Sequence, residues 1–345
     1  MLTSSLLQRN LLPDGLIRQG IRRLLRQRLR DEDHGSQEAR QTHFLTLVEE
    51  LKKNPIAVQP AAANEQHYEV PTEFYQYALG RHMKYSSGYW PDSLHIETDI
   101  DASEEAMLVL TCERAEIKDG QDILELGCGW GSLSLFMAQK FPGSRIKAVS
   151  NSRTQKAYID EQCQRRGVKN LDIITADMNV FEIPQRFDRV VSVEMFEHMR
   201  NYEKLMGKVA SWLKPDGKLF VHMFVHKEFA YPFEVKDSSD WMSKYFFTGG
   251  IMPSDHLLLY FQNDLTIQKH WRVDGTHYQK TSEAWLSRMD AHRAEILPIF
   301  EKTYGPSEAL KWWVYWRIFF MSCAELWGFR GGSEWFVSHY LFQRK

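Results

Sequence analysis

The amino-acid sequence predicts an α/β fold built on a mostly parallel sheet of seven strands. From residue 101 onward, short apolar runs typical of buried strands alternate with longer stretches typical of helices. Alternating glycines follow the first of these strands, where α/β sheets place ligand-binding loops. With 43% hydrophobic residues in 345, the chain has enough apolar side chains for one large core.

The elements follow one another with recognisable signals. Ser103 and the acidic residues after it are typical of a helix start, and β-branched runs mark the strands. The predicted helices are 103–114, 132–140, 154–166 and 202–213, and the predicted strands are 122–126, 145–149, 171–175, 189–193 and 218–224. Such alternation predicts helices on both faces of the sheet and ligands at the carboxyl ends of the strands.

After residue 224 the alternation stops. An insertion over about 225–264 is expected to form a lid above the site. The closing elements predicted after it are a strand at 265–273, helices at 282–296 and 307–327, and a strand at 335–342. The helix 307–327 is aromatic nearly all round, so most of its rings are expected in the core, although some could wall a pocket for an aromatic or cationic acceptor.

Residues 1–65 are expected to form a helical extension and a linker, the latter rich in Pro and Ala at 60–64, before a main domain at 66–345. Residues 16–29 predict a basic amphipathic helix. Its apolar face comprises Ile17, Ile21, Leu24, Leu25 and Leu29. Packing on the domain or on a second subunit is the favoured interpretation; contact with a membrane surface and an organellar transit sequence stay open as alternatives.

Composition and charge limit the classes of partner that the protein can bind. A formal net charge of −2 gives no overall attraction to nucleic acid, and no nucleic-acid motif is present. No apolar run approaches the roughly 20 residues that span a bilayer. The four cysteines lack a CxxC pair, which favours a reducing compartment, and we expect a cytoplasmic protein.

The most informative motif is the loop after the strand 122–126. Gly127, Gly129 and Gly131 stand at alternate positions, and Glu125 precedes them by two. This GxGxG spacing fits neither the GxGxxG dinucleotide loop nor a GK[ST] phosphate loop. An acidic residue before such a loop is typical of S-adenosylmethionine (AdoMet) methyltransferases. Glu125 is expected near the ammonium of the cofactor or the N–H groups of the loop.

Polar residues after the next two strands complete a predicted cofactor site. Ser150, Asn151 and Gln155 take the place of the acid that often binds ribose hydroxyls, and their neutral groups can make the same hydrogen bonds. Asp177 and Met178 are placed for an adenine amine and its apolar ring face.

The fourth strand ends in a dense polar cluster of Glu194, Glu197 and His198. Carboxylates here can anchor a substrate ammonium or raise the basicity of His198, which can then accept the proton of an amine. The alternative is a plain helix N-terminus, where Glu is favoured. A zinc site with His222 and His226 lacks any HExxH or paired-cysteine spacing, so we expect pocket or core histidines and no metal.

Several motifs resemble the family of cyclopropane-fatty-acyl-phospholipid synthases and mycolic acid methyltransferases, and within it the plant coclaurine N-methyltransferase branch. They are Tyr85-Ser86-Ser87-Gly88-Tyr89-Trp90, the loop 124–131, Glu194 to His198, His222, Gly275-Thr276-His277-Tyr278, Thr111-Cys112-Glu113-Arg114-Ala115 and Ser338-His339. The resemblance implies a Rossmann-like class I AdoMet-dependent methyltransferase fold.

The resemblance also implies roles for single residues. Tyr85 and Ser86 would close over AdoMet, with Val193 beside the cofactor, and Glu194, Glu197 and His198 would serve acceptor binding and proton removal. The residues expected around the acceptor are His222, Phe319, Trp327 and Trp335.

Two departures bear on the reaction. The bicarbonate site of cyclopropane synthases uses a cysteine, a glutamate, a histidine and a tyrosine. Here Glu197 and His222 match, whereas Ser87 and Phe319 replace the cysteine and the tyrosine. We therefore expect methyl transfer to a small-molecule acceptor, at an amine nitrogen, with methylation of unsaturated phospholipid chains or of a small thiol as alternatives. A homodimer and peripheral membrane contact through the basic helix are further expectations.

Overall fold

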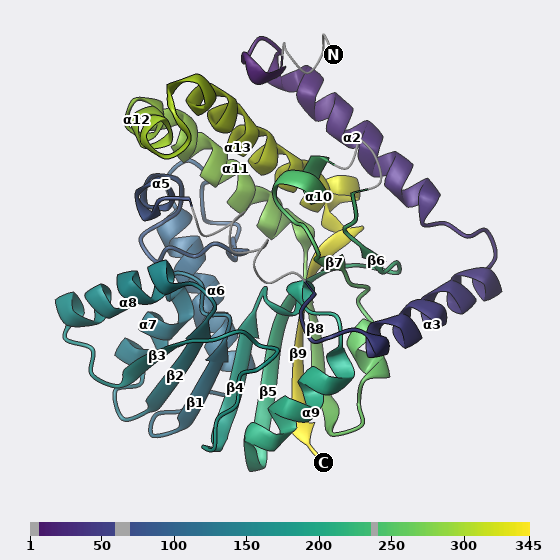
Figure 1. Ribbon diagram of the computed structural model, residues 1–345, viewed down its shortest axis with the longest axis vertical. Coiled ribbons are helices and arrows are strands. Elements are labelled where there is room, and N and C mark those ends of the chain that lie inside the picture. Colours follow the sequence, from purple (N-terminus) through teal and green to yellow (C-terminus); the bar gives the residue numbers. More distant parts are fainter. Residues whose placement is uncertain (1–6, 59–69, 236–240) are drawn as a thin grey trace.

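The computed structural model describes residues 7–58, 70–235 and 241–345. Seven strands form one sheet in the order β3-β2-β1-β4-β5-β9-β8 (Figure 1). Their bounds are β1 Asp122–Leu126, β2 Arg145–Ser150, β3 Leu171–Thr175, β4 Phe187–Val193, β5 Leu213–His226, β8 Leu265–Val273 and β9 Trp335–Arg344. The predicted α/β class and the predicted strands are confirmed.

The strand order places a switch point in the sheet. Strands β1 to β5 pair in parallel, and β9 lies antiparallel between β5 and β8. From β1 the chain moves outward to β2 and β3 and then returns to β4 on the other side of β1. The crevice at the carboxyl ends of β1 and β4 is therefore the place where such a sheet binds ligands.

Helices cover both faces of the sheet, as the alternation predicted. They are α6 Ile100–Arg114, α7 Ser132–Lys140, α8 Arg153–Arg166 and α9 Tyr202–Trp212. Successive strand residues point to opposite faces. Ile123 accordingly packs in a cluster with α6 and α7, whereas Leu124 packs in a cluster with α9.

A helical layer covers one end of the sheet (Figure 1). It contains α11 Gly275–Ala291, α12 Arg293–Tyr304 and α13 Pro306–Trp327, and α5 Thr72–Ala78 packs against α11 and α12. The prediction of a single helix at 282–296 is wrong. Asp274 accepts a hydrogen bond from the Thr276 N–H and starts α11 earlier, and His292, with non-helical dihedral angles, separates α11 from α12. Most rings of α13 are buried in the core, as expected.

The insertion after β5 is mostly irregular. Its elements are β6 Tyr231–Pro232, α10 Trp241–Tyr245, β7 Ile251–Met252 and the 3₁₀ turn η2 Leu257–Tyr260; two further 3₁₀ turns are η1 Phe196–His198 and η3 Phe329–Gly332. Thr248 and Gly249 of this insertion line a cavity above the strand ends. This position agrees with the expected lid.

The N-terminal helices α2 Asp14–Asp31 and α3 Gln37–Lys53 pack on the main domain. Ile17 and Ile21 of α2 contact the cluster that contains α13, and Arg18 forms ion pairs with Glu283 at 2.7 Å and Glu325 at 3.1 Å. Packing of α2 on its own chain is thus confirmed, although Leu24 of the predicted apolar face stays exposed. The predicted linker at 60–64 lies outside the described residues.

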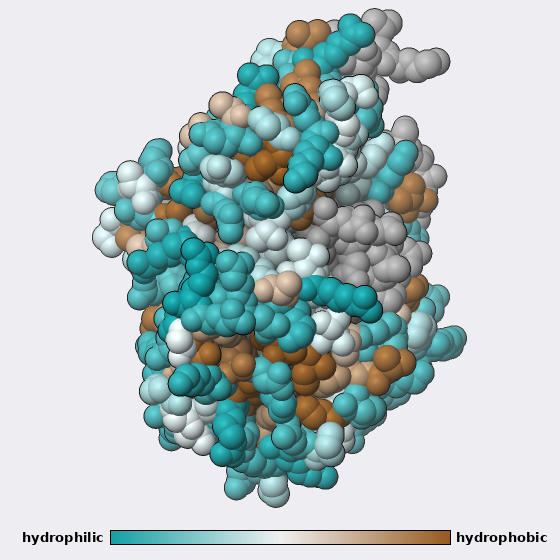
Figure 2. Space-filling model, turned by 60° about the vertical axis from the view of Figure 1, so that its left-hand side comes forward, coloured by the Kyte–Doolittle hydropathy of each residue, from teal (hydrophilic) through white to brown (hydrophobic). Residues whose placement is uncertain are grey.

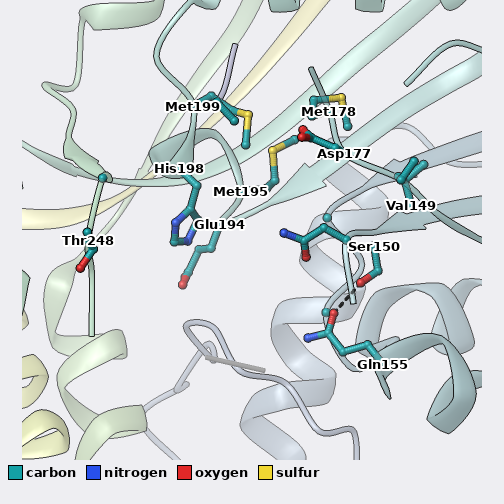
Figure 3. A pocket seen from close by; sticks show the side chains of 16 residues that line it. Val149, Ser150, Gln155, Asp177, Met178, Glu194, Met195, His198, Met199 and Thr248 are labelled. Carbon is teal, nitrogen blue, oxygen red and sulfur yellow. Dashed lines mark hydrogen bonds between the residues drawn. The ribbon is translucent and has the colours of Figure 1, made fainter. Parts of the chain in front are cut away.

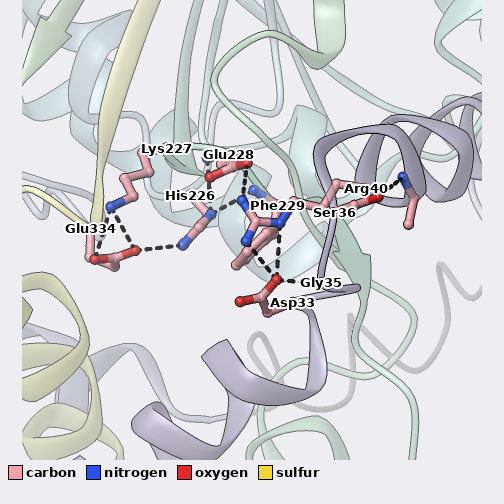
Figure 4. Close-up of polar contacts among 10 residues, drawn as sticks. Asp33, Gly35, Ser36, Arg40, His226, Lys227, Glu228, Phe229 and Glu334 are labelled. Carbon is pink, nitrogen blue, oxygen red and sulfur yellow. Dashed lines mark hydrogen bonds and ion pairs between the residues drawn. The ribbon is translucent and has the colours of Figure 1, made fainter.

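A second group of ion pairs ties α3 to the segment after β5 (Figure 4). Arg40 contacts Asp33 at 2.6 Å and Glu228 at 3.2 Å, and His226 in turn bonds Glu334 at 3.2 Å. The face of the molecule in Figure 2 is largely hydrophilic, with hydrophobic side chains in separate groups. Across the ranges that the structure describes, none of the helices combines the length and apolar character needed to cross a bilayer.

Candidate active site

Two adjoining cavities lie at the carboxyl ends of β1, β2 and β4. The first has a volume of about 810 Å³ and the second of about 600 Å³, each including space that is open to solvent. Both are lined by Gly127, Gly129, Gln155 and Glu194. A pair of adjoining cavities of this size can hold a cofactor and a small second molecule.

The glycine loop forms the floor between the cavities. Gly127, Gly129 and Gly131 all have positive φ angles, of 77°, 51° and 78°. A Cβ on Gly129 would meet no atom within 4 Å, so this glycine leaves open space on the cavity side. Gly131 lines neither cavity: it precedes α7, and a Cβ there would lie 2.7 Å from the Ile159 side chain. Close packing against α8 thus requires a glycine at this position, and the contact of Gly131 with the cofactor stays a prediction.

Glu125 lies on the wall of the second cavity and is buried. Its carboxylate accepts a hydrogen bond from the Ser134 hydroxyl, and burial raises its pKa to about 7. The loop N–H groups of Gly127 and Cys128 donate instead to the Val149 carbonyl, at 2.9 and 3.0 Å. Of the two roles expected for Glu125, the contact with loop N–H groups is therefore wrong.

The residues predicted after β2 and β3 gather on one side of the first cavity (Figure 3). The Ser150 hydroxyl donates a hydrogen bond of 2.7 Å to Gln155 Oε1. Asn151 is beside them on the wall. Asp177 and Met178 line the same cavity from the segment after β3. The structure thus brings together all five residues that the sequence predicted for the ribose and adenine.

Three buried polar atoms of residues that line the cavities lack partners. Within the described residues, Trp130 Nε1, Ser132 Oγ and Gln155 Nε2 make no hydrogen bond. Ser132 lines the second cavity and Gln155 lines both. Buried polar groups are nearly always paired, so these atoms point to a polar ligand. Together with the space above Gly129, they fit a nucleoside joined to an amino acid, as AdoMet is.

Tyr85, Ser86 and Val193 line the second cavity, as predicted, and so does Lys84, which the sequence analysis missed. The Lys84 ammonium donates hydrogen bonds to the Ser86 hydroxyl and to the Ser87 carbonyl. Burial lowers its pKa to about 8, against the opposing effect of Glu194 and two further carboxylates. In the sequence, Lys84 could have been found from its position directly before the Tyr85-Ser86 motif.

Glu194 lines both cavities and belongs to the polar cluster of Glu194, Glu197 and His198. Its Oε1 accepts a hydrogen bond from the Ser87 N–H at 3.0 Å and lies 3.2 Å from His222 Nε2, and its Oε2 accepts from the Tyr278 hydroxyl at 2.6 Å. Burial raises its pKa despite the nearby Lys84 ammonium. Its φ of 46° is rare for a residue with a side chain and stores strain of the kind found at functional sites.

His198 lines the first cavity next to Glu194 (Figure 3). The expectation of a raised basicity is wrong, because burial lowers the pKa of His198 to about 4 while Glu194 opposes this shift only in part. The imidazole is therefore neutral at pH 7. Its ring lies 4.6 Å from the Phe247 ring of the insertion.

Glu197 is fully buried and lines neither cavity. Its Oε1 accepts a hydrogen bond of 2.7 Å from the Phe224 N–H. Burial and the neighbouring Glu194 raise its pKa well above the ordinary value. This hydrogen bond supports β5, while Glu197 Oε2 is buried without a partner among the described residues, and its contact with the reactants stays a prediction.

The side chains predicted around the acceptor lie behind the walls of the two cavities. Phe319 stacks on Phe246 at 4.5 Å, Trp327 stacks on Tyr278 at 4.7 Å, and the Trp335 N–H donates to the Tyr231 hydroxyl at 3.2 Å. His222 is likewise behind Glu194. None of the four lines either cavity, and their contact with an acceptor stays a prediction. The sequence missed Thr248, Gly249 and Met199, which line the first cavity.

The two histidines of β5 have partners inside the protein. His222 bonds Glu194 and His339, and His226 bonds Glu334. The two rings lie in different surroundings, as expected for histidines of a pocket or a core. In the described part of the chain, the groups close enough to hold a metal reduce to Glu32, His34 and His43, near the α2–α3 turn and outside this site.

The chain is similar to known proteins over most of its length. Residues 57–329 match the family model for mycolic acid cyclopropane synthetase. An (S)-coclaurine N-methyltransferase from Thalictrum flavum subsp. glaucum is 40% identical over 343 residues, which cover 98% of this chain and 94% of the relative.

Solved structures agree. The crystal structure of a coclaurine N-methyltransferase bound to N-methylheliamine and SAH superposes with a TM-score of 0.95 at 40% identity, covering 99% of both chains. The cyclopropane synthase MmaA2 from Mycobacterium tuberculosis shares the fold at 17% identity, with a TM-score of 0.69 over 84% of this chain and all of that one. The chain therefore belongs to the mycolic acid cyclopropane synthetase family, together with N-methyltransferases, and is an AdoMet-dependent methyltransferase.

Proposed function

We propose that the protein transfers the methyl group of AdoMet to the amine nitrogen of a small molecule bound in the first cavity. The observation that carries this proposal is the position of Glu194. Its carboxylate lies on the wall of both cavities and is held there by Ser87, Tyr278 and His222. A carboxylate at this place can hold an ammonium group and accept the proton that the nitrogen must lose.

AdoMet, when bound, supplies a methyl group on a positively charged sulfur. Asp177 and Met178 would hold its adenine, Ser150, Asn151 and Gln155 its ribose, and Lys84 the carboxylate at its amino-acid end. The buried walls exclude water and align the acceptor with the methyl group, and such alignment can lower a barrier by several kcal/mol. Glu194 would first take the proton of the bound ammonium, which leaves a lone pair on the nitrogen. That lone pair would then form the new N–C bond as the S–C bond of the donor breaks.

His198 contributes as a neutral group. With its pKa near 4, it adds no positive charge to the cavity and does not repel a cationic acceptor. It can accept a hydrogen bond from the acceptor's N–H group. We infer that Glu194 binds the charge of the amine and that His198 orients it.

The same site is poorly built for ring formation on an alkene, which needs a base to deprotonate a carbocation. Ser87 donates its hydroxyl to the Gly88 carbonyl at 2.9 Å, and Phe319 offers no oxygen. These are the two positions at which the resemblance implies a cysteine and a tyrosine. Transfer to nitrogen needs neither.

Incubation of the purified protein with isotopically labelled AdoMet and three acceptor panels tests the proposal. We expect label in secondary and tertiary amines, and none in small thiols or in unsaturated phospholipids presented as vesicles. Label in thiols or acyl chains, without label in any amine, would overturn the nitrogen assignment.

A further inference from the structure

A chain of hydrogen bonds leads from Glu194 through two buried histidines to an arginine. His222 Nε2 lies 3.2 Å from Glu194 Oε1, His222 Nδ1 lies 3.0 Å from His339 Nε2, and His339 Nδ1 lies 2.9 Å from the Arg114 guanidinium. We call these four residues the histidine chain. Both imidazoles are fully buried. The motifs around Arg114 and His339 are among those of the family resemblance, and the reaction proposed above gives neither residue a role.

The sheet itself aligns the histidines. His222 on β5 and His339 on β9 are direct partners in the antiparallel register, so their side chains point to the same face. Arg114 is the last residue of α6 on that face, and its guanidinium lies 5.2 Å from the centre of the Trp271 ring on β8. Three elements far apart in sequence thus fix the chain.

The direction of the hydrogen bonds follows from the arginine. A guanidinium has donors and no acceptor, so His339 Nδ1 must accept. The proton of a neutral His339 then sits on Nε2 and is donated to His222 Nδ1. His222 in turn carries its proton on Nε2 and donates it to Glu194. Burial lowers the pKa of both histidines well below the ordinary value, which agrees with one proton on each ring.

The opposite direction would require a protonated Glu194 that donates to His222. His339 would then present an N–H group to the guanidinium, and two donors would face each other. The chain is also unsuitable as an exit for protons, because it ends on a group that cannot accept one. Its geometry permits one state, in which an N–H group points at Glu194 Oε1.

We propose that Arg114 and His339 are positioning residues that act through His222 to fix both tautomers and keep Glu194 an acceptor of hydrogen bonds. The kinetic consequence of this inference rests on the proposed function. A Glu194 carboxylate that accepts hydrogen bonds is the form that binds an ammonium and takes its proton. The tautomers themselves do not depend on which acceptor is methylated.

Other titratable groups also face this region and stay unchanged in the test. They are Lys84, Glu197, His198, Tyr278 and Cys323 around Glu194. The variants are Arg114→Met, which removes the donor, and Arg114→Lys, which keeps a donor and the charge. Arg293→Met is the matched control, because Arg293 stacks over Trp313 at 5.9 Å and lies outside the chain.

The first measurement is ¹⁵N–¹H correlation NMR of the full-length protein with labelled histidine, with the two rings assigned from His222→Gln and His339→Gln. We expect protons on Nε2 of both rings in the wild type, and a proton on Nδ1 of His339 for part of the molecules in Arg114→Met. Arg114→Lys should restore the wild-type pattern at least in part, and Arg293→Met should keep it. A wild-type proton on Nδ1 of His339, or an unchanged pattern in Arg114→Met, overturns the inference.

The second measurement is the pH profile of kcat/KM. In Arg114→Met, Glu194 can be protonated and donate, so the acidic limb should move upward by about one pH unit, a tenfold loss below the limb. Arg114→Lys should move it less and Arg293→Met not at all; a profile unchanged in Arg114→Met counts against the inference. If no amine is a substrate, the proposed function fails, while the NMR result still decides whether the histidine chain has this direction.

Discussion

The Tyr278 hydroxyl donates a hydrogen bond of 2.6 Å to Glu194 Oε2, and it does so from a helix that begins 81 residues after Glu194 in the chain. The opposite oxygen of the carboxylate accepts from Ser87 and His222. Glu194 is therefore held by side chains or backbone from three separate parts of the sequence, at the junction of two cavities.

Replacing Glu194 by Gln should lower kcat/KM for an amine by about 10²–10⁴, the usual contribution of a positioned acid–base group. The amide keeps the size of the side chain and loses the charge that binds the ammonium. Steady-state kinetics and AdoMet titration calorimetry measure the two effects separately. Glu161→Gln, on the exposed face of α8, is the control. Full activity of the Glu194 variant would contradict the assignment.

The substitution Glu197→Gln should leave the stability of the protein nearly unchanged, whereas Glu197→Ala should lower it. Glu197→Gln keeps the size of the side chain and an oxygen for the Phe224 N–H, whereas Glu197→Ala leaves that N–H unpaired and should cost about 1–3 kcal/mol of stability. Thermal and urea denaturation measure the difference. A large loss of kcat with normal stability in Glu197→Gln would instead support direct participation in the reaction.

The raised pKa of Glu197 also gives a pH test. The folded state holds its proton at pH values where the unfolded chain, with an ordinary value of 4.5, has lost it. The free energy of unfolding of the wild type should therefore fall, relative to Glu197→Gln, as the pH rises above about 4.5. Urea unfolding of both proteins from pH 5 to 8 checks this; a constant difference would refute the raised pKa.

Alanine substitutions at two glycines of the loop should distinguish an effect on stability from an effect on cofactor binding. Alanine at Gly129 or at Gly131 has a similar backbone cost of about 1–2 kcal/mol, because both φ angles are positive. Gly131→Ala adds a clash with Ile159 and should lower the melting temperature further. Gly129→Ala fills the cavity side and should weaken AdoMet binding more than it lowers stability. Equal losses of affinity in the two variants would argue against the cavity position of Gly129.

AdoMet affinity should depend on the protonation of Lys84. If its ammonium holds the carboxylate of the cofactor, affinity is full below the pKa of about 8 in the ligand-free protein and falls as the pH rises through it. Calorimetry of the wild type and Lys84→Met between pH 7 and 9 gives the contribution of Lys84 by difference, since the titration of AdoMet itself is common to both. Parallel curves for the two proteins would exclude this contact.

Helix α2 should bind its own domain and not a membrane. Arg18 is paired with Glu283 and Glu325, and Arg22 is paired with Glu325, so these cations are already neutralised. We expect no co-sedimentation with anionic phospholipid vesicles at low ionic strength. The double variant Glu283→Gln and Glu325→Gln removes the partners of these arginines. It serves as the positive control, for which we expect binding to the vesicles. Salt-sensitive binding of the wild type would restore the membrane interpretation.

The sequence by itself determined the architecture. The strand β1 and the helix α7 lie where an apolar run and the glycines after it predicted them, because these signals arise from neighbours within a few positions. The same local pattern placed the cofactor residues at strand ends, since parallel strands bring their carboxyl ends to one edge. It could not separate α11 from α12, where a single residue interrupts the helical pattern.

Tertiary structure alone decided the chemical state of the site. His198 carries the lowered pKa of a buried ring in place of the raised one expected from its carboxylate neighbours, and burial raises the pKa of Glu197 against β5. Lys84, Tyr278 and Arg114 reach the Glu194 region from distant elements. Desolvation and hydrogen bonding depend on atoms that meet only in the folded chain, so the residue types named the candidates and the packing assigned their roles.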